Sequence, residues 1–185
     1  MKQSRATIRY AKAFLQLSVE QNQLDRSYKD MMLLDTICSE NKELLLLLRS
    51  PIVKTDQKLK IFDQIFKNKV SDLSMSFLNI IISKKREAIL SYIAKSFILL
   101  YKAQNKIETA VVTTAQPISQ ELKNKVLTYI KKETKNNIEL IELVDKKIKG
   151  GVVIRMGDKQ LDASIFTEIS KLKQIFNKNL YVQDF

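Results

Sequence analysis

The three glycines of this 185-residue chain all lie between positions 150 and 157, and this placement constrains the fold more than any other feature. Glycine adopts positive φ and lets backbones approach each other without steric cost. Gly150 and Gly151 therefore predict a sharp entry into a strand at residues 152–156, which are rich in β-branched side chains. Gly157 and Asp158 then suit a two-residue hairpin turn.

The residues after this turn predict the rest of a small folding unit. A short return strand is expected at residues 159–161, and Asp162 or Ser164 offers a side-chain oxygen that caps a helix. Apolar side chains then recur at helical spacing, at Ile165, Ile169, Leu172 and Phe176. The stretch is therefore expected to form a strand, a turn, a second strand and a capped helix.

The hydrophobic period changes at Asn105. Before it, helical patterns are expected at residues 5–19, 25–40, 43–49, 55–67, from Ser71 or Ser74 onward, and 89–104. After it come a strand at 107–114, a helix capped by Ser119 and a strand at 138–144. The order predicts an α+β chain, with an N-terminal six-helix bundle (residues 1–104) followed by a small C-terminal α/β domain (residues 105–185).

Two of the expected helices carry apolar residues on two sides. In the first, Ile8, Ala11, Leu15 and Val19 fall on one side, and Tyr10, Ala13, Phe14 and Leu17 fall on the other. The fifth repeats this pattern, with Leu73, Phe77, Ile80 and Ile81 in one stripe and Met75, Leu78 and Ile82 in another. A helix at the centre of the core explains the pattern, and so does a helix with one stripe in the bundle and one on a partner.

Composition argues against an enzyme. The chain has no histidine and a single cysteine, Cys38, so the commonest general base and the usual zinc-binding clusters are missing. Cys38 lies on an apolar helical face and is expected to be a small core residue. We expect no catalytic residues, no metal site and no cofactor.

The net charge of +12 favours an anionic partner, which could be nucleic acid, a membrane surface or an acidic protein. The lysines are dispersed and are not interleaved with aromatic residues at a stacking spacing. A basic nucleic-acid-binding module nevertheless stays the alternative interpretation. No apolar run is long enough to span a membrane, and the N-terminus enters a helical pattern at once, so we expect a cytoplasmic protein.

Six short motifs, in order along the chain, resemble those of the delta subunit of F-type ATP synthase (the OSCP/delta family). The most specific is the glycine stretch with its structural signature at Gly150, Gly151, Gly157, Asp158, Asp162 and Ser164. The other five are Arg9-Tyr10-Ala11-Lys12-Ala13-Phe14, Ser50-Pro51-Ile52 with Lys58, Phe77-Leu78 with Arg86, the segment 97–101 and the segment 109–117.

The resemblance implies a non-catalytic stator connector, which links the catalytic alpha/beta hexamer to the peripheral stalk so that rotor torque drives ATP synthesis from proton translocation. It implies that residues 1–104 bind the N-terminal helix of an alpha subunit in a groove between the first and fifth helices, and that residues 105–185 bind the C-terminus of the stalk b subunit. The protein would lie at the cytoplasmic face of a bacterial inner membrane, held there only through the complex. The predicted groove residues are Tyr10, Ala13, Leu17, Phe77 and Ile80, with Phe14 a marginal member.

Overall fold

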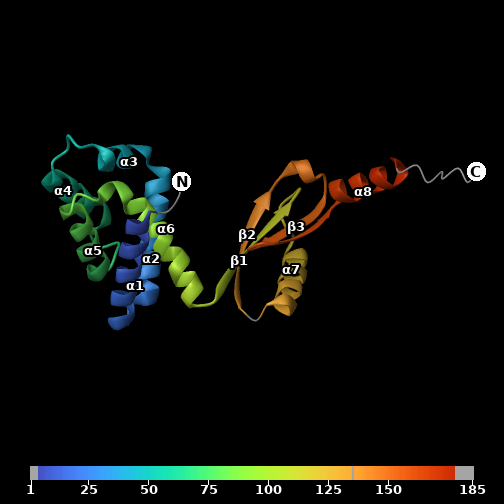
Figure 1. Ribbon diagram of the computed structural model, residues 1–185, viewed down its shortest axis with the longest axis horizontal. Coiled ribbons are helices and arrows are strands. Elements are labelled where there is room, and N and C mark those ends of the chain that lie inside the picture. The colour runs from blue at the N-terminus through green and yellow to red at the C-terminus, as the bar shows by residue number, and fades with distance from the viewer. Residues whose placement is uncertain (1–3, 135, 178–185) are drawn as a thin grey trace, which may run out of the picture. The chain divides into compact units, whose positions relative to one another are not determined.

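A run of helices precedes a mixed sheet along this chain (Figure 1). The computed structural model describes residues 4–134 and 136–177, and within them six α-helices are followed by four strands and two further α-helices. The chain divides into two units between Gln104 and Asn105. The predicted α+β fold class is confirmed.

The N-terminal unit is entirely helical in the part of the chain that the structure describes. A single turn of 3-10 helix, η1 (Glu87–Ile89), leads into its last α-helix. The α-helices are α1 (Arg5–Glu20), α2 (Leu24–Glu40), α3 (Lys42–Arg49), α4 (Thr55–Phe66), α5 (Asp72–Ser83) and α6 (Leu90–Gln104).

Serine side chains begin two of these helices. The Ser4 Oγ accepts a hydrogen bond from the backbone N–H of Thr7 at the start of α1, and the Ser71 Oγ accepts one from Ser74 at the start of α5. Each satisfies a backbone donor that has no partner within the helix. The sequence left Ser71 and Ser74 open as the start of α5, and the structure selects Ser71 as the capping residue.

Aromatic rings pack together in the core of the N-terminal unit, among aliphatic side chains. Phe14, Phe62, Phe66 and Phe97 are at most 1% exposed. The Phe14 ring lies 5.1 Å from that of Phe97, and the Phe62 ring lies 5.2 Å from that of Phe66. Each buried aromatic side chain removes a large apolar area from water, and ring pairs add to that stabilisation.

The buried line of α1 differs from the two predicted stripes. Thr7, Ala11, Phe14 and Ser18 face the core. This line takes Ala11 from one predicted stripe and Phe14 from the other, and the remaining residues of the two stripes lie on either side of it. A polar residue can occupy the line because the Ser18 Oγ–H reaches the Phe14 carbonyl oxygen at 2.7 Å. Helix α1 therefore has one buried face with an apolar flank on each side.

The C-terminal unit contains a four-stranded sheet in the order β2-β1-β3-β4. Strand β1 pairs in parallel with β2 and antiparallel with β3, and β3 pairs antiparallel with β4. The elements are β1 (Ile107–Thr114), α7 (Gln120–Glu133), β2 (Asn137–Val144), the 3-10 turn η2 (Lys146–Ile148), β3 (Gly151–Met156), β4 (Lys159–Ser164) and α8 (Ile165–Asn177). Strand β4 is longer than predicted.

Helix α7 covers one face of this sheet. Val126 and Ile130 of α7 form a core with Ala110 and Val112 of β1 and Ile154 of β3. Residues that alternate with these along β1 and β2 point to the other face, because side chains of a strand alternate between its two sides. Ile141 and Leu143 on that face are 41% and 51% exposed.

Candidate partner-binding surfaces

Two ring contacts join α1 to α5 and to the turn that follows α5. The Phe14 ring of α1 stacks on the Phe77 ring of α5, with centroids 4.2 Å apart and planes 19° from parallel. Further along, the Arg86 guanidinium lies over the Tyr10 ring, 5.9 Å from its centroid. Tyr10 lies beside Arg86, and Phe14, one turn later in α1, lies beside the earlier residue Phe77. The two segments therefore run antiparallel at this contact.

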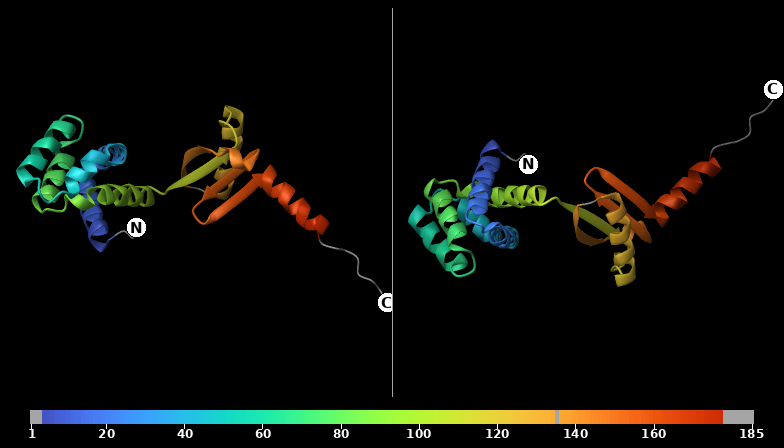
Figure 2. Two further views of the ribbon diagram at one scale, coloured as in Figure 1. Left: turned by 90° about the horizontal axis from the view of Figure 1, so that it is seen from above. Right: turned by 90° about the horizontal axis from the view of Figure 1, so that it is seen from below.

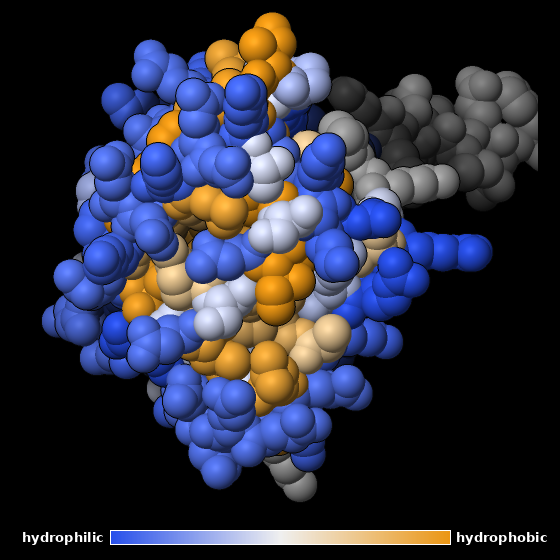
Figure 3. Space-filling model, turned by 90° about the vertical axis from the view of Figure 1, so that its left-hand side faces the viewer, coloured by the Kyte–Doolittle hydropathy of each residue, from blue (hydrophilic) through white to orange (hydrophobic). Residues whose placement is uncertain are grey.

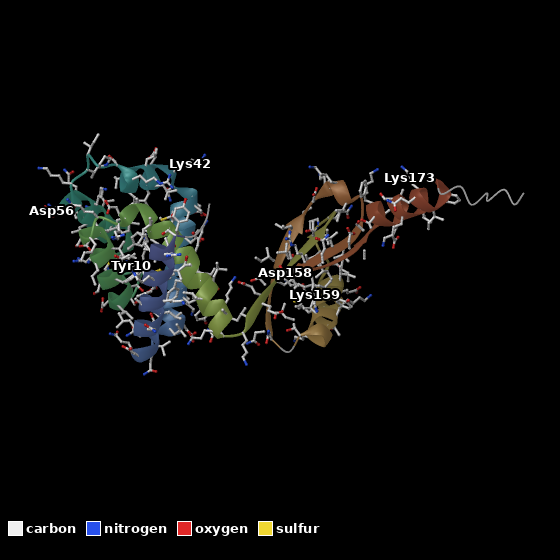
Figure 4. All side chains as sticks on the ribbon, in the orientation of Figure 1. Tyr10, Lys42, Asp56, Asp158, Lys159 and Lys173 are labelled. Carbon is white, nitrogen blue, oxygen red and sulfur yellow. The ribbon has the colours of Figure 1, made fainter. Side chains whose placement is uncertain are left out.

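Tyr10 and Phe77, two of the predicted groove residues, take part in these contacts, and the five predicted residues differ in exposure. Ala13 is exposed, Tyr10 is half-buried, and Leu17 and Ile80 are 38% and 54% exposed. Tyr10 is labelled on α1 in Figure 4. Phe77 is only 8% exposed, because its ring packs against Phe14. Phe77 therefore lies beneath the surface residues, as the floor between the two helices and not as a wall.

The marginal candidate Phe14 belongs to the core. It is 1% exposed and contacts both Phe77 and Phe97. Figure 3 views the N-terminal unit from the α4–α5 side and shows hydrophobic side chains reaching the surface among hydrophilic ones. The floor of the α1–α5 junction is thus continuous with the core, and its flanks are apolar and open to solvent.

A buried carboxylate fixes the start of α5. Asp30 of α2 is 2% exposed, and its Oδ2 accepts hydrogen bonds from the Ser71 N–H at 2.8 Å and from the Ser71 and Ser74 hydroxyls at 2.7 Å each. Arg26 lies 3.5 Å from the other carboxylate oxygen. Hydrogen bonds to a charged acceptor are stronger than neutral ones, so Asp30 anchors α5 in position beside α1. Sequence patterns gave no indication of this network.

The glycine signature builds the junction at which β3, β4 and the start of α8 meet. Gly151 has φ +81, and a Cβ placed on it would lie 2.2 Å from the Ala163 carbonyl oxygen. Gly150 also has positive φ, and its carbonyl accepts the hydrogen bond from the Ile165 N–H. Gly157 has φ +55 at the β3–β4 turn, beside Asp158, and Figure 4 labels Asp158 and Lys159 there. These residues bring β3, β4 and α8 close together.

Asp162 and Ser164 share the capping role that the sequence left open between them. The Ser164 Oγ accepts the hydrogen bond from the Thr167 N–H, while Asp162 accepts from the Ser164 N–H at 2.9 Å and from the Thr167 hydroxyl at 2.9 Å. These hydrogen bonds, chiefly from Ser164, lower the pKa of the Asp162 carboxyl below its ordinary value. The ionised Asp162 carboxylate therefore fixes Ser164 and Thr167 at the start of α8.

The apolar face of α8 stays largely exposed among the residues that the structure describes. Ile165, Ile169, Leu172 and Phe176 lie on one side of the helix and are between 43% and 83% exposed. Figures 1 and 2 both show α8 extending away from the sheet of its own unit. An apolar face of this length on a described helix is the kind of surface that a partner covers. The sequence predicted the face but not its exposure.

Among residues 4–134 and 136–177, no group of three or more Asp, Glu, Cys or His side chains is placed to hold a metal ion. None of the described helices is long and apolar enough to cross a membrane. Cys38 is buried as predicted.

Comparison with known proteins identifies the family. The family model described as ATP synthase delta (OSCP) subunit matches residues 6–176. The "ATP synthase subunit delta" of Cytophaga hutchinsonii is 33% identical over 97% of this chain and 98% of its own length, and that of Christiangramia forsetii is 32% identical over 98% of each. The delta subunit of Chlorobaculum tepidum is 32% identical over 91% of this chain and 93% of its own.

A solved structure shares the fold. A chain in the mitochondrial ATP synthase hexamer of Toxoplasma gondii superposes with a TM-score of 0.69, at 24% identity, covering 94% of this chain and 98% of that one. With a family model that spans both units and relatives that align along nearly their whole length, the chain belongs to the ATP synthase delta (OSCP) subunit family.

Proposed function

We propose that this chain is a non-catalytic stator connector of an F-type ATP synthase, which links the catalytic alpha/beta hexamer to the peripheral stalk. Family membership supports the assignment to the complex. The observation that carries the connecting role is the presence of two separate apolar surfaces, one on each unit. They are the α1–α5 flanks around Leu17 and Ile80, and the exposed face of α8.

The α1–α5 surface suits the N-terminal helix of an alpha subunit. An amphipathic helix laid into an apolar trough needs a firm floor and apolar walls. The Phe14–Phe77 stack supplies the floor, while Tyr10, Leu17 and Ile80 supply walls. The small side chain of Ala13 leaves room for close approach of a helix backbone. Residues 1–104 are therefore proposed as the alpha-binding domain.

The face of α8 suits the C-terminus of a stalk b subunit. Ile169, Leu172 and Phe176 recur at helical spacing, so a second amphipathic helix can pack along them. Lys171 and Lys173 lie on the same helix and would meet acidic residues of the partner at the rim. Lys173 is labelled in Figure 4. Residues 105–185 are therefore proposed as the b-binding domain.

The energy that the rotor delivers for each ATP sets the binding affinity that such a connector needs. Each elementary charge that crosses 100 mV releases about 2.3 kcal/mol, so several charges per ATP deliver on the order of 10 kcal/mol that the stator must resist. Nanomolar binding corresponds to about 12 kcal/mol. Buried aromatic and aliphatic contacts can reach this value, whereas rim lysines mainly steer association. The complex would hold the protein at the cytoplasmic face of the membrane.

Two matched substitutions in the full chain test the proposal. Ile80→Asp and Ile169→Asp each place one carboxylate on an exposed apolar surface, so both variants should keep the fold. Ile80→Asp should weaken binding of an alpha N-terminal peptide at least tenfold and leave b binding unchanged. Ile169→Asp should do the opposite with a b C-terminal peptide.

Isothermal titration calorimetry with the two peptides measures both affinities, and each variant is the control for the other. If neither peptide binds the unmodified chain, the connector proposal is wrong. If one substitution weakens both peptides alike, the assignment of one surface to each partner is wrong.

A further inference from the structure

The apolar face of α8 has the spacing of a coiled-coil seam. Successive residues of the face lie four, three and four positions apart, at Ile165, Ile169, Leu172 and Phe176. This is the alternation of d and a positions in a heptad repeat, which keeps one line of apolar side chains facing a partner helix. All four side chains are exposed, so the whole line is open to a second helix.

The residue types at the two central positions of this seam favour one kind of coil. Ile169 takes an a position and Leu172 takes a d position. A β-branched residue at a, combined with leucine at d, favours two helices in parallel orientation. The seam of α8 therefore suits a single partner helix that runs in the same direction.

The charges beside the seam are complementary to a second copy of the same helix. Glu168 takes a g position and Lys173 takes the e position of the next heptad, and both side chains are exposed. In a parallel two-helix coil, a g residue of one helix lies beside the e residue five positions later on the other. Two copies of α8 therefore form two Glu168–Lys173 pairs, one on each side of the seam. In an antiparallel coil g residues face g residues, so Glu168 would lie beside Ile175 and these pairs would not form.

We infer that α8 is a self-association element, through which two copies of the free chain form a parallel coil centred on Ile169 and Leu172. The start of α8 favours this dimer, because Asp162 and Ser164 fix its first turn and an isolated helix of this length is marginal in water. Figures 1 and 2 show α8 extending away from the sheet of its own unit, which leaves room for a second helix along it. Two heptads form a small interface, so we expect a dissociation constant on the order of 100 µM. Self-association goes beyond the stator role and does not depend on it.

Sedimentation equilibrium of the full chain tests the dimer. The unmodified chain should pass from monomer to dimer as its concentration rises through this range. Ile169→Asp places a carboxylate in the seam and should weaken the dimer about tenfold or more, whereas Gln174→Asp adds the same charge at an f position, away from the seam, and should leave it unchanged.

Two results would overturn the inference. The first is a chain that stays monomeric at about ten times the expected dissociation constant, which would leave the α8 face to a stalk helix or another partner. The second is a dimer that Ile169→Asp does not weaken, because its contact would then lie on another surface.

A charge swap in the same measurement tests the parallel direction. Glu168→Lys or Lys173→Glu alone brings like charges together on both sides of the seam and should weaken the dimer about fivefold. The double variant Glu168→Lys with Lys173→Glu restores opposite charges and should recover the affinity of the unmodified chain. Its net charge equals that of the unmodified chain, so each single variant is compared with a matched partner. Equal affinities of the single and double variants would overturn the parallel arrangement.

Discussion

Lys58 of α4 and Glu87 of η1 form an ion pair whose side chains are only 4% and 11% exposed, with the Nζ 2.5 Å from the Oε1. The same ammonium donates to the carbonyl oxygens of Leu48 at 3.1 Å and Ser50 at 2.8 Å. Lys58 therefore ties the end of α3 and the turn at Pro51 to the start of α6. This explains physically why a lysine follows the Ser50-Pro51-Ile52 motif.

Removal of this lysine should destabilise the N-terminal unit severely. Lys58→Met leaves the Glu87 carboxylate buried without a counter-charge, and loss of one partner of a buried pair costs about 3–5 kcal/mol. Urea unfolding followed by circular dichroism measures the free energy of unfolding. The double variant Lys58→Met with Glu87→Gln should regain part of the loss, whereas Lys60→Met, at an exposed position, should change the value by less than about 0.5 kcal/mol. Equal stability of Lys58→Met and the unmodified chain would show that the pair contributes nothing.

A carboxylate placed between the groove walls should reduce partner binding without unfolding the chain. Ala13 is exposed on the flank of α1 that also carries Tyr10 and Leu17. In the proposed complex, Ala13→Asp would bury a charge in an apolar contact, and we expect at least tenfold weaker binding of the alpha peptide in calorimetry. Gln16→Asp adds the same charge outside the groove and serves as the control. An unchanged affinity for Ala13→Asp would remove Ala13 from the groove.

Two glycines with positive φ should tolerate substitution to very different degrees. Gly151→Ala meets both an unfavourable φ of +81 and the Ala163 carbonyl oxygen at 2.2 Å, so it should cost at least about 2 kcal/mol. Gly157→Ala has φ +55 and no atom within 4 Å of the new Cβ, so it should cost about 1 kcal/mol. Thermal denaturation of the two variants compares them directly. Equal losses would mean that φ alone, and not the close approach of β4, selects glycine at position 151.

Cys38 should be inert in the folded protein. Burial, with a smaller contribution from the Asp35 carboxylate, raises the pKa of its thiol to about 11 from an ordinary value of 9.0. Because the thiolate is the reactive form, Ellman's reagent at pH 8 should react with the native chain at least 100-fold more slowly than with the chain in urea. The raised pKa also means that this group stabilises the fold fully below pH 9, and that the contribution is lost as the pH rises toward 11. Rapid native reaction at pH 8 would contradict the burial of Cys38.

Most elements could be predicted because their signals are local. The period of apolar residues located the helices, and strand β1 was predicted with its observed bounds, residues 107–114. Ser119 was predicted as the cap of α7, and its Oγ accepts from the Leu122 N–H. Each of these features depends on residues within a few positions of each other, which a single sequence displays.

What the sequence did not reveal depends on contacts between distant segments. The Ser18 hydroxyl lies 3.0 Å from that of Ser27 on the next helix, and this partner lets a polar residue occupy the core line of α1. Phe77 was predicted as a groove residue together with the exposed Ile80, because helical spacing cannot show that its ring reaches Phe14 and is buried. Strand β4 ended too early in the prediction because its exposed, polar residues lack an apolar alternation, although Asp162 pairs with Val153. Exposure of the α8 face likewise depends on what packs against it.

The position of Phe14 has a thermodynamic consequence. One ring contacts both the groove floor at Phe77 and the core ring of Phe97, so a ligand seated on that floor binds a feature that exists only in the folded bundle. Because the peptide binds only the folded state, its binding stabilises that state by mass action. Free peptide at 100 times its dissociation constant raises the free energy of unfolding by about 2.7 kcal/mol. Binding would raise the melting temperature of the whole helical unit, and a dye-based melting curve could report it without any label on either partner.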